Sequence, residues 1–185
     1  MQYENTIAAS IAVFGGANTG VTSGDNLDQP AEYGVGLSYV MGGSTLAVDY
    51  KKVEWGSANG YKDFGWEDQD VYAIGYEYAT KGWALRAGYN YAKSPIKEQI
   101  AAGPASFGAG VRNFFNIAGF PGMVESHYTV GAGYNMSDDL SIDCAVVYAA
   151  EEKNTFGVSA IGGAGKTITT VHSQLGLTVG ATYKF

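Results

Sequence analysis

The sequence predicts an all-β protein, an antiparallel transmembrane β-barrel with about eight strands in this chain, and three observations favour this fold class. Apolar residues alternate with small or polar ones along short segments, and this period of two places them on opposite faces of a strand. Glycine (27) and tyrosine (14) are abundant whereas proline (4) is scarce, which suits many strands with aromatic ends. The segments are joined alternately by short turns and long loops, as in barrels that cross a membrane.

The last segment shows the alternation most clearly. Its two faces are Leu175, Leu177 and Val179 on the apolar side, and Gln174, Gly176 and Thr178 on the other. A tilted strand needs roughly 9–11 residues to cross a bilayer, and this segment has about that length. It ends on Tyr183 and Phe185, and this ending resembles the terminal signal that the barrel-assembly machinery recognises. We therefore expect a closing strand whose apolar face contacts lipid.

The same alternation recurs along the chain, which could form a single domain over residues 1–185. The expected strands are about 4–14, 32–40, 45–54, 69–79, 83–92, 127–136, 139–150 and 169–185. Their apolar faces are bracketed by tyrosine or tryptophan in several strands, as the two aromatic belts at the membrane interfaces require. The opposite faces carry many glycines together with Arg86 and Asp143. These faces would make a poor core for a soluble β-sandwich, which is the alternative fold.

The connections give the expected orientation in the membrane. Turns at 41–44, 80–82 and 136–139 are short, whereas loops 15–31, 55–68, 93–126 and 151–168 are long. In outer-membrane barrels the short turns are periplasmic and the long loops are extracellular. With Phe185 at the periplasmic side, the order of short and long connections agrees with this rule.

Composition excludes several classes of protein. The formal net charge of −7 argues against a nucleic-acid partner, because nucleic acids attract basic surfaces. Cys144 is the only cysteine, so the chain has no internal disulfide and no cysteine-based metal pattern. No apolar run approaches the ~20 residues of a membrane helix. The first residues lack the features of a signal peptide, so we expect a mature form or a chain that begins partway through a longer protein.

No catalytic or cofactor-binding set is evident, so we expect no enzyme. His127 and His172 lie far apart in sequence, and neither belongs to a recognisable Ser, Cys or Asp motif. The segment 157–166 is rich in glycine and its last two residues begin a Gly-Lys-Thr sequence at 165–167, but its glycine spacing does not match a phosphate-binding loop. We interpret it as an external loop.

The predicted lumen-facing residues are small, with Gly34, Gly36, Gly131 and Gly133 among them. An eight-stranded barrel is just wide enough for side chains to fill its interior. Glycines leave room for a plug, a ligand or a wide lumen, which favours a piece of a larger barrel over a complete small one.

Three stretches suggest a family. They are WEDQDVYAIGYEY at 66–78, LRAGYNYAKSPI at 85–96 and HYTVGAGY at 127–134. Together with Pro30 before a strand and Asp49-Tyr50 leading to Trp55, they resemble the outer-membrane long-chain fatty-acid and aromatic-hydrocarbon transporter family, the FadL/TodX type. The resemblance covers about residues 30–185.

The resemblance implies the C-terminal half of a fourteen-stranded barrel in the outer membrane of a Gram-negative bacterium. Family members are plugged by an N-terminal hatch, which has no counterpart in this sequence. The implied function is passage of a long-chain fatty acid or an aromatic hydrocarbon by passive diffusion, without a cofactor. The implied partners are this ligand, outer-membrane lipid and the barrel-assembly machinery. The alternative is a small structural or adhesive eight-stranded barrel of the OmpA type.

The candidate ligand-binding residues are mostly aromatic and come from the outward loops. They are Trp55, Phe64, Trp66, Phe107, Phe114, Phe115 and Phe120. Exposed aromatic side chains are costly unless they are covered or used, so simple packing of the loops over the barrel mouth is an equal alternative. For a carboxylate head group the resemblance points to Lys62, at the spacing after Trp55 where such transporters carry a ligand-contacting lysine. Arg86 is the second candidate, although we expect it to pair with Glu77 or Asp143.

Overall fold

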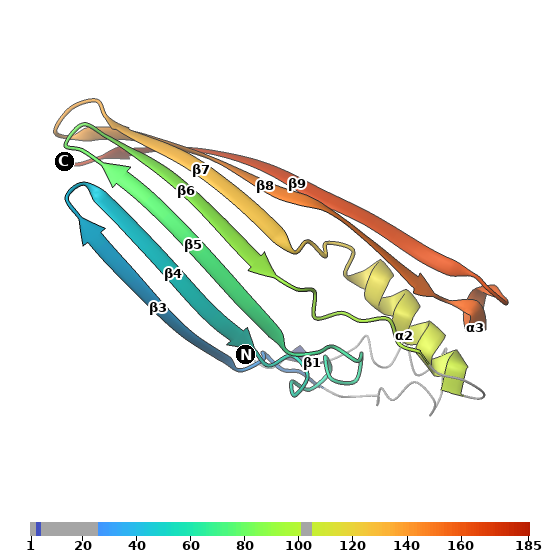
Figure 1. Ribbon diagram of the computed structural model, residues 1–185. Helices are drawn as coiled ribbons and strands as arrows, with labels where there is room; N and C mark the ends of the chain where they lie inside the picture. Colours follow the sequence, from blue (N-terminus) through green and yellow to red (C-terminus); the bar gives the residue numbers. More distant parts are fainter. Residues whose placement is uncertain (1–2, 5–25, 101–104) are drawn as a thin grey trace.

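The computed structural model describes residues 3–4, 26–100 and 105–185, and its main element is one curved antiparallel sheet (Figure 1). Each strand pairs with the next one in the chain, in the order β3 to β9. The strands are β3 (Glu32–Met41), β4 (Ser44–Val53), β5 (Gln69–Ala79), β6 (Trp83–Ala92), β7 (Ser126–Asn135), β8 (Leu140–Gly157) and β9 (Thr167–Tyr183). The sheet is not closed, because β3 and β9 do not pair with each other.

Three shorter features complete the described part of the chain. The two-residue strands β1 (Tyr3–Glu4) and β2 (Asn26–Leu27) pair with each other in a separate sheet. Helix α2 (Ala105–Gly119) lies between β6 and β7, and helix α3 (Ser159–Gly162) lies between β8 and β9. Neither of these described helices has the length and apolar content that a helix needs to cross a membrane.

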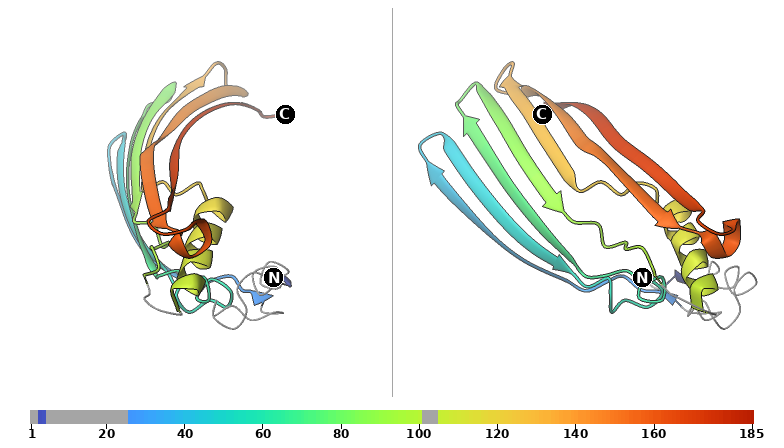
Figure 2. Two further views of the ribbon diagram at one scale, coloured as in Figure 1. Left: turned by 90° about the vertical axis from the view of Figure 1, so that its right-hand side faces the viewer. Right: turned by 45° about the vertical axis from the view of Figure 1, so that its right-hand side comes forward.

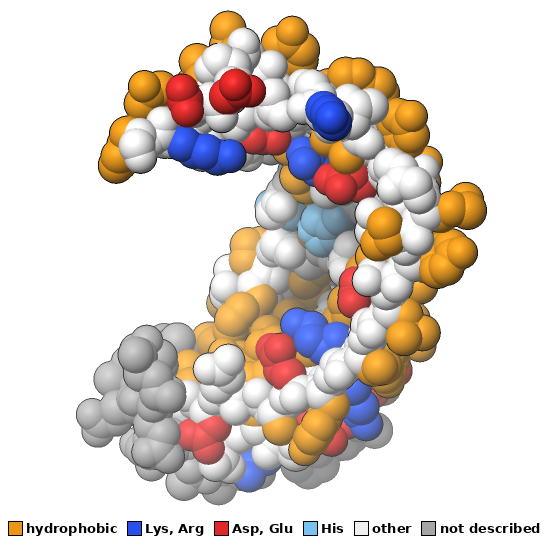
Figure 3. Space-filling model, turned by 90° about the vertical axis from the view of Figure 1, so that its left-hand side faces the viewer, with side chains coloured by type: hydrophobic (Ala, Val, Ile, Leu, Met, Phe, Trp, Pro, Cys, Tyr) orange, Lys and Arg blue, Asp and Glu red, His pale blue; other side chains and the backbone are white. Residues whose placement is uncertain are grey.

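The convex face of the sheet is apolar and exposed. Leucines on the two edge strands are among the most exposed apolar residues, at 75% for Leu37, 77% for Leu175 and 73% for Leu177. Figure 3 shows hydrophobic side chains over the convex surface and charged side chains on the concave side. In water such a large apolar surface would be unfavourable, so the arrangement fits a wall that faces lipid. The predicted division of the strands into an apolar outer face and a small or polar inner face is therefore confirmed.

Tyrosines gather on the convex face near the outer ends of the strands. Tyr50 and Tyr72 have ring centroids 5.4 Å apart, and Tyr89 and Tyr128 have centroids 4.9 Å apart. A second group lies near the short turns, where Tyr78 and Trp83 are 5.4 Å apart. Trp83 in turn pairs in register with Tyr134. Two such groups, separated by aliphatic residues, match the aromatic belts of a membrane barrel.

The two ends of the sheet differ. The short turns 42–43, 80–82 and 136–139 lie at one end together with the end of the chain, whereas α2, α3 and the long connections lie at the other (Figure 1). Seen along the sheet, the strands form an open C, and α2 lies on its inner side (Figure 2). In the expected orientation, the end with α2 faces outside the cell.

Two expected connections need correction. The strand expected at 139–150 continues as β8 to Gly157, so the loop expected at 151–168 is reduced to a short link with α3. The connection expected as the loop 93–126 contains the 15-residue helix α2. In the other six strands of the sheet, both ends lie within two residues of the expected positions.

The described sheet contains seven of the eight expected strands. From residue 5 onward the expected strand 4–14 lies outside the described residues, as does its pairing with 171–185.

Candidate ligand-binding site

The concave wall is lined mainly by small side chains. One row of register partners crosses all seven strands: Ser38, Ala47, Gly75, Gly88, Thr129, Val147 and Gly176. Some positions in this row have no room for a larger side chain. A Cβ atom at Gly88 would lie 2.6 Å from Oγ1 of Thr129. The predicted glycine-rich lumen is therefore a continuous feature of the wall.

Arg86 lies on this wall between two carboxylates. Its Nε donates to Oε2 of Glu77 at 2.6 Å, and its Nη1 donates to Oδ1 of Asp143 at 3.2 Å. The second bond crosses β7 at Gly133, where a Cβ atom would lie 2.6 Å from Oδ1 of Asp143. The expected ion pair is confirmed with both carboxylates. A guanidinium so neutralised attracts a ligand carboxylate weakly, and Arg86 as a ligand contact stays a prediction.

The loops at the α2 end build a small apolar core of their own. Phe64 and Ile117 have no exposed surface, and five more buried residues join them: Trp66, Ile96, Val111, Met123 and Phe156. Partly buried apolar residues pack around this core: Leu27, Trp55, Tyr61, Phe115, Phe120 and Ile168. α2 therefore packs against both the connection between β4 and β5 and the hairpin of β8 and β9.

Two buried asparagines fasten α2 to its surroundings. Asn113 donates from Nδ2 to the carbonyls of Gln99 (3.0 Å) and Gly157 (2.9 Å), and its Oδ1 accepts from the Gln99 amide (2.7 Å). Asn116 donates to the carbonyl of Phe64 (2.9 Å) and accepts from the indole N–H of Trp66 (3.1 Å). Each bond satisfies a polar group that burial would otherwise leave without a partner.

Beside this core is an apolar cleft of about 300 Å³. It is lined by Trp66, Gln69, Ser94, Pro95, Ile96, Phe120, Gly122, Met123 and Val124. Gln69 is in register with Val53 on the concave face of the sheet, and a Cβ atom at Gly122 would lie 3.8 Å from Nε2 of His172 on β9. The cleft is thus on the concave side of the sheet, where the strands meet α2 and the loops at the same end, which together form the cap. Its volume lies at the lower limit of ligand pockets, roughly 300 Å³.

The predicted aromatic residues divide into three groups. Trp66 and Phe120 line the cleft. Phe64, Phe115 and Trp55 lie behind it in the core, with Trp55 and Trp66 ring centroids 5.1 Å apart. Phe114 is 48% exposed and lies outside both sets. Nothing is described for the side chain of Phe107. Packing of the loops therefore accounts for part of the aromatic set and the cleft for another part.

Lys62 does not line the cleft. Its side chain is exposed, and Nζ donates to Oδ1 of Asn59 at 2.6 Å. Its part in binding a carboxylate stays a prediction, as does the assembly signal at Tyr183 and Phe185. Sequence reasoning did not identify Pro95, Ile96 and Met123 as cleft residues. The first two follow Ser94 directly, in a motif noted only for its family resemblance.

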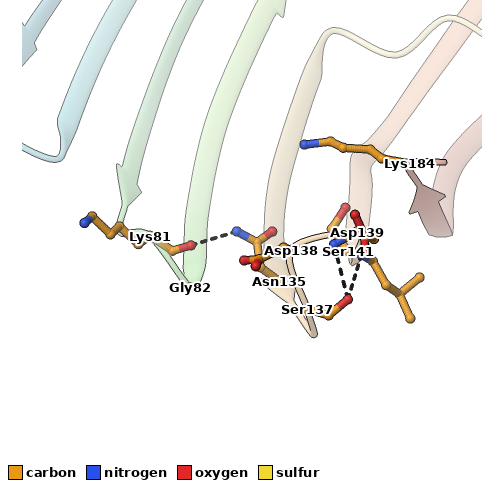
Figure 4. A pocket seen from close by; sticks show the side chains of 9 residues that line it. Lys81, Gly82, Asn135, Ser137, Asp138, Asp139, Ser141 and Lys184 are labelled. Atoms are coloured by element: carbon orange, nitrogen blue, oxygen red, sulfur yellow. Dashed lines mark hydrogen bonds between the residues drawn. The ribbon is translucent and has the colours of Figure 1, made fainter.

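A second depression, of about 310 Å³, lies at the end with the short turns (Figure 4). Lys81, Asp138, Asp139 and Lys184 give it side chains of both charges. Asn135 donates to the carbonyl of Lys81 at 2.8 Å, which joins the turn of β5 and β6 to that of β7 and β8. This rim is unsuited to an apolar ligand. Among the described residues, no group of three or more His, Cys, Asp or Glu side chains could hold a metal ion.

No family model and no curated sequence matches the chain. Solved structures do match. The TodX deltaS2S3 mutant monoaromatic hydrocarbon channel is similar with a TM-score of 0.59, 21% identity, and coverage of 87% of this chain and 37% of that one. The Pseudomonas putida toluene transporter TodX gives a TM-score of 0.56, 20% identity, and coverage of 87% and 37%.

A Pseudomonas aeruginosa FadL homologue is also similar, with a TM-score of 0.53, 19% identity, and coverage of 96% of this chain and 43% of that one. The chain thus spans about two fifths of the length of the structures that it matches. At these identities the likeness concerns the fold. The chain therefore has the antiparallel β-wall fold of the TodX and FadL-type channels, as the resemblance in its sequence implied.

Proposed function

We propose that this chain forms part of a β-barrel in the outer membrane of a Gram-negative bacterium, through which hydrophobic compounds pass by diffusion. One observation carries the proposal. The concave, polar side of a lipid-facing sheet holds an apolar cleft where the wall meets the capping loops. A cleft of this kind gives an apolar molecule a place to leave water at the entrance of the lumen. The names of the similar structures, a hydrocarbon channel and a toluene transporter, support it.

The ligand would bind first in the cleft beside Trp66 and then continue along the wall of small residues. No bond is made or broken, so the movement needs only a concentration difference. The alternative is a structural or adhesive barrel whose loops face the surroundings. The cleft favours passage over this alternative, because a purely structural cap has no need for an apolar opening toward the lumen.

The test uses the full-length protein encoded by the gene, in a Gram-negative host that lacks channels for hydrocarbons and fatty acids. Uptake of radiolabelled toluene and oleate is measured for the wild type and for Met123→Trp, which fills the cleft. The larger side chain takes up space that a ligand would occupy, and its cost to folding, about 1–3 kcal/mol for overpacking, is why uptake is compared at equal amounts of folded protein. The matched control is Met136→Trp, since Met136 is 57% exposed in the turn between β7 and β8.

We expect Met123→Trp to lower toluene uptake and Met136→Trp to leave it unchanged, at equal amounts of folded protein in the membrane. Equal uptake by the two variants would remove the cleft from the route. No uptake of either compound by the wild type would overturn passage and favour the structural barrel. Liposomes without an energy source then show whether entry is passive.

Lys62 is tested separately, with oleate as the ligand. If its ammonium binds the carboxylate, Lys62→Ala weakens oleate binding, because a charge-assisted hydrogen bond is lost. An unchanged affinity eliminates Lys62 as the head-group site.

A further inference from the structure

The polar groups around the cleft are already paired within the protein. None of the described residues that line the cleft is charged. The Gln69 side chain donates to the carbonyl of Lys93 (2.9 Å) and accepts from the indole of Trp55 (3.4 Å). The Ser94 hydroxyl accepts from the amide of Ile96 at 3.2 Å. A ligand in the cleft therefore meets apolar atoms and polar atoms that are engaged elsewhere.

Trp66 has the largest side chain on the cleft wall. Its one polar atom, the indole nitrogen, would make the cleft polar if its N–H pointed toward the ligand. An indole N–H is a donor only, and when it is buried it needs an acceptor. Here the acceptor is Oδ1 of Asn116, a side chain with no exposed surface. The Nδ2 of Asn116 is fixed in turn by the carbonyl of Phe64. The amide of Asn116 is thereby held with its oxygen toward the indole.

The rest of the Trp66 ring is held by aromatic neighbours. Its ring centroid lies 5.1 Å from that of Trp55, 4.9 Å from that of Tyr61 and 4.9 Å from that of Phe120. With the N–H directed to Asn116, the ring presents carbon atoms to the cleft, and Phe120 and Ile96 beside it add only apolar surface.

We propose that Asn116 is a positioning residue that sets the chemical selectivity of the cleft by keeping the Trp66 N–H away from the ligand. The inference rests on the function proposed above and narrows its substrate class. The cleft takes small hydrocarbons without a hydrogen-bonding group and discriminates against molecules of the same size that carry an acceptor. Such a molecule would leave its own acceptor without a partner, which costs free energy on desolvation.

The experiment measures binding of toluene and benzaldehyde, two compounds of similar size, to the full-length protein in detergent by calorimetry. Three proteins are compared: wild type, Asn116→Leu and Asn113→Leu. Asn113 is the matched control because it is equally buried on α2 and bonds only to backbone groups and not to an aromatic ring. A variant of either residue loosens the helix, but only Asn116→Leu leaves the Trp66 N–H without its acceptor.

We expect the wild type to prefer toluene, and Asn116→Leu to reduce this preference about two- to tenfold, because the indole can then donate to the carbonyl of benzaldehyde. Asn113→Leu should keep the wild-type preference. A preference unchanged in Asn116→Leu, or reduced equally in both variants, would overturn the proposal. Failure of the wild type to bind either compound would instead overturn the proposed function.

A second measurement follows the ligands in the wild-type protein and uses a variant only to assign the resonance. The indole N–H resonance of Trp66 in the wild-type protein, identified by its loss in Trp66→Phe, is followed by NMR during titration with each compound. We expect slow hydrogen exchange and the same small shift with both compounds. A downfield shift with benzaldehyde alone would mean that the N–H reaches the ligand, and would contradict the proposal.

Discussion

Leu177 and its neighbour Thr178 give a direct test of which face contacts lipid. Leu177 is 73% exposed on the convex face and is in register with Val146, whereas Thr178 is in register with Ala145 on the concave face. Leu177 lies between the two aromatic groups, since Tyr148 and Tyr183 belong to register pairs on either side of it. Leu177→Arg would therefore place a charge near the middle of the bilayer.

The expected magnitudes differ clearly. An arginine on the lipid side of a membrane β-barrel costs about 2–4 kcal/mol at the midplane. On the concave side the same side chain reaches water, so Thr178→Arg should change the free energy of unfolding by no more than about 0.5 kcal/mol. A difference of 2–4 kcal/mol corresponds to roughly 30- to 1,000-fold in the ratio of folded to unfolded protein.

The assay is equilibrium unfolding of the full-length protein by urea in phospholipid vesicles, followed by tryptophan fluorescence. We expect a lower midpoint for Leu177→Arg and a wild-type midpoint for Thr178→Arg. Equal destabilisation by both variants, or a larger effect of Thr178→Arg, would refute the assignment of the faces.

Three further perturbations follow from the structure. Phe64→Ala should lower the free energy of unfolding of the cap by about 3–5 kcal/mol because Phe64 has no exposed surface, whereas Phe114→Ala should cost less than about 0.5 kcal/mol. Limited proteolysis of the loops compares the two variants, and equal cleavage would contradict the packing. Gly133→Val should separate Arg86 from Asp143, and the loss of stability should be about 1 kcal/mol or less because the ion pair is exposed to water. Urea unfolding measures this loss, and a far larger value would mean another role for Gly133. Gly42→Ala should cost about 1–2 kcal/mol because φ at Gly42 is 59°; an unchanged unfolding midpoint would exclude strain there.

The strands could be predicted because each has two faces in different surroundings. Leu175 and Leu177 alternate with Gln174 and Gly176, and only a strand places each set on one side. β8 was expected to end near residue 150 because Glu151, Glu152 and Lys153 interrupt the apolar pattern. Beyond the shift in register between Ala149 and Glu152, the strands β8 and β9 stay paired up to Gly157, although no row of apolar residues continues there on the outer face.

Helix α2 could not be predicted for a different reason. Its sequence, ASFGAGVRNFFNIAG, contains three glycines and two asparagines, which have low helix propensity. The helix depends on tertiary contacts, chiefly burial of Val111 and Ile117 and the bonds of Asn113 and Asn116. The candidate site could be predicted only in part for the same reason, because it too depends on tertiary contacts. The aromatic residue types indicated an apolar region, but only the packing of the loops decides that Trp66 borders the cleft and Phe64 lies behind it.

The claim on which the other proposals depend is that the convex face of β9 contacts lipid and the concave face contacts water. Spin labels at positions 174 to 179, introduced one at a time in a Cys144→Ser background of the full-length protein in vesicles, measure this directly. Access to oxygen, which dissolves in lipid, should be high at 175, 177 and 179, and access to a water-soluble nickel complex should be high at 174, 176 and 178. Accessibility without this alternation, or with the two sets reversed, would contradict the account.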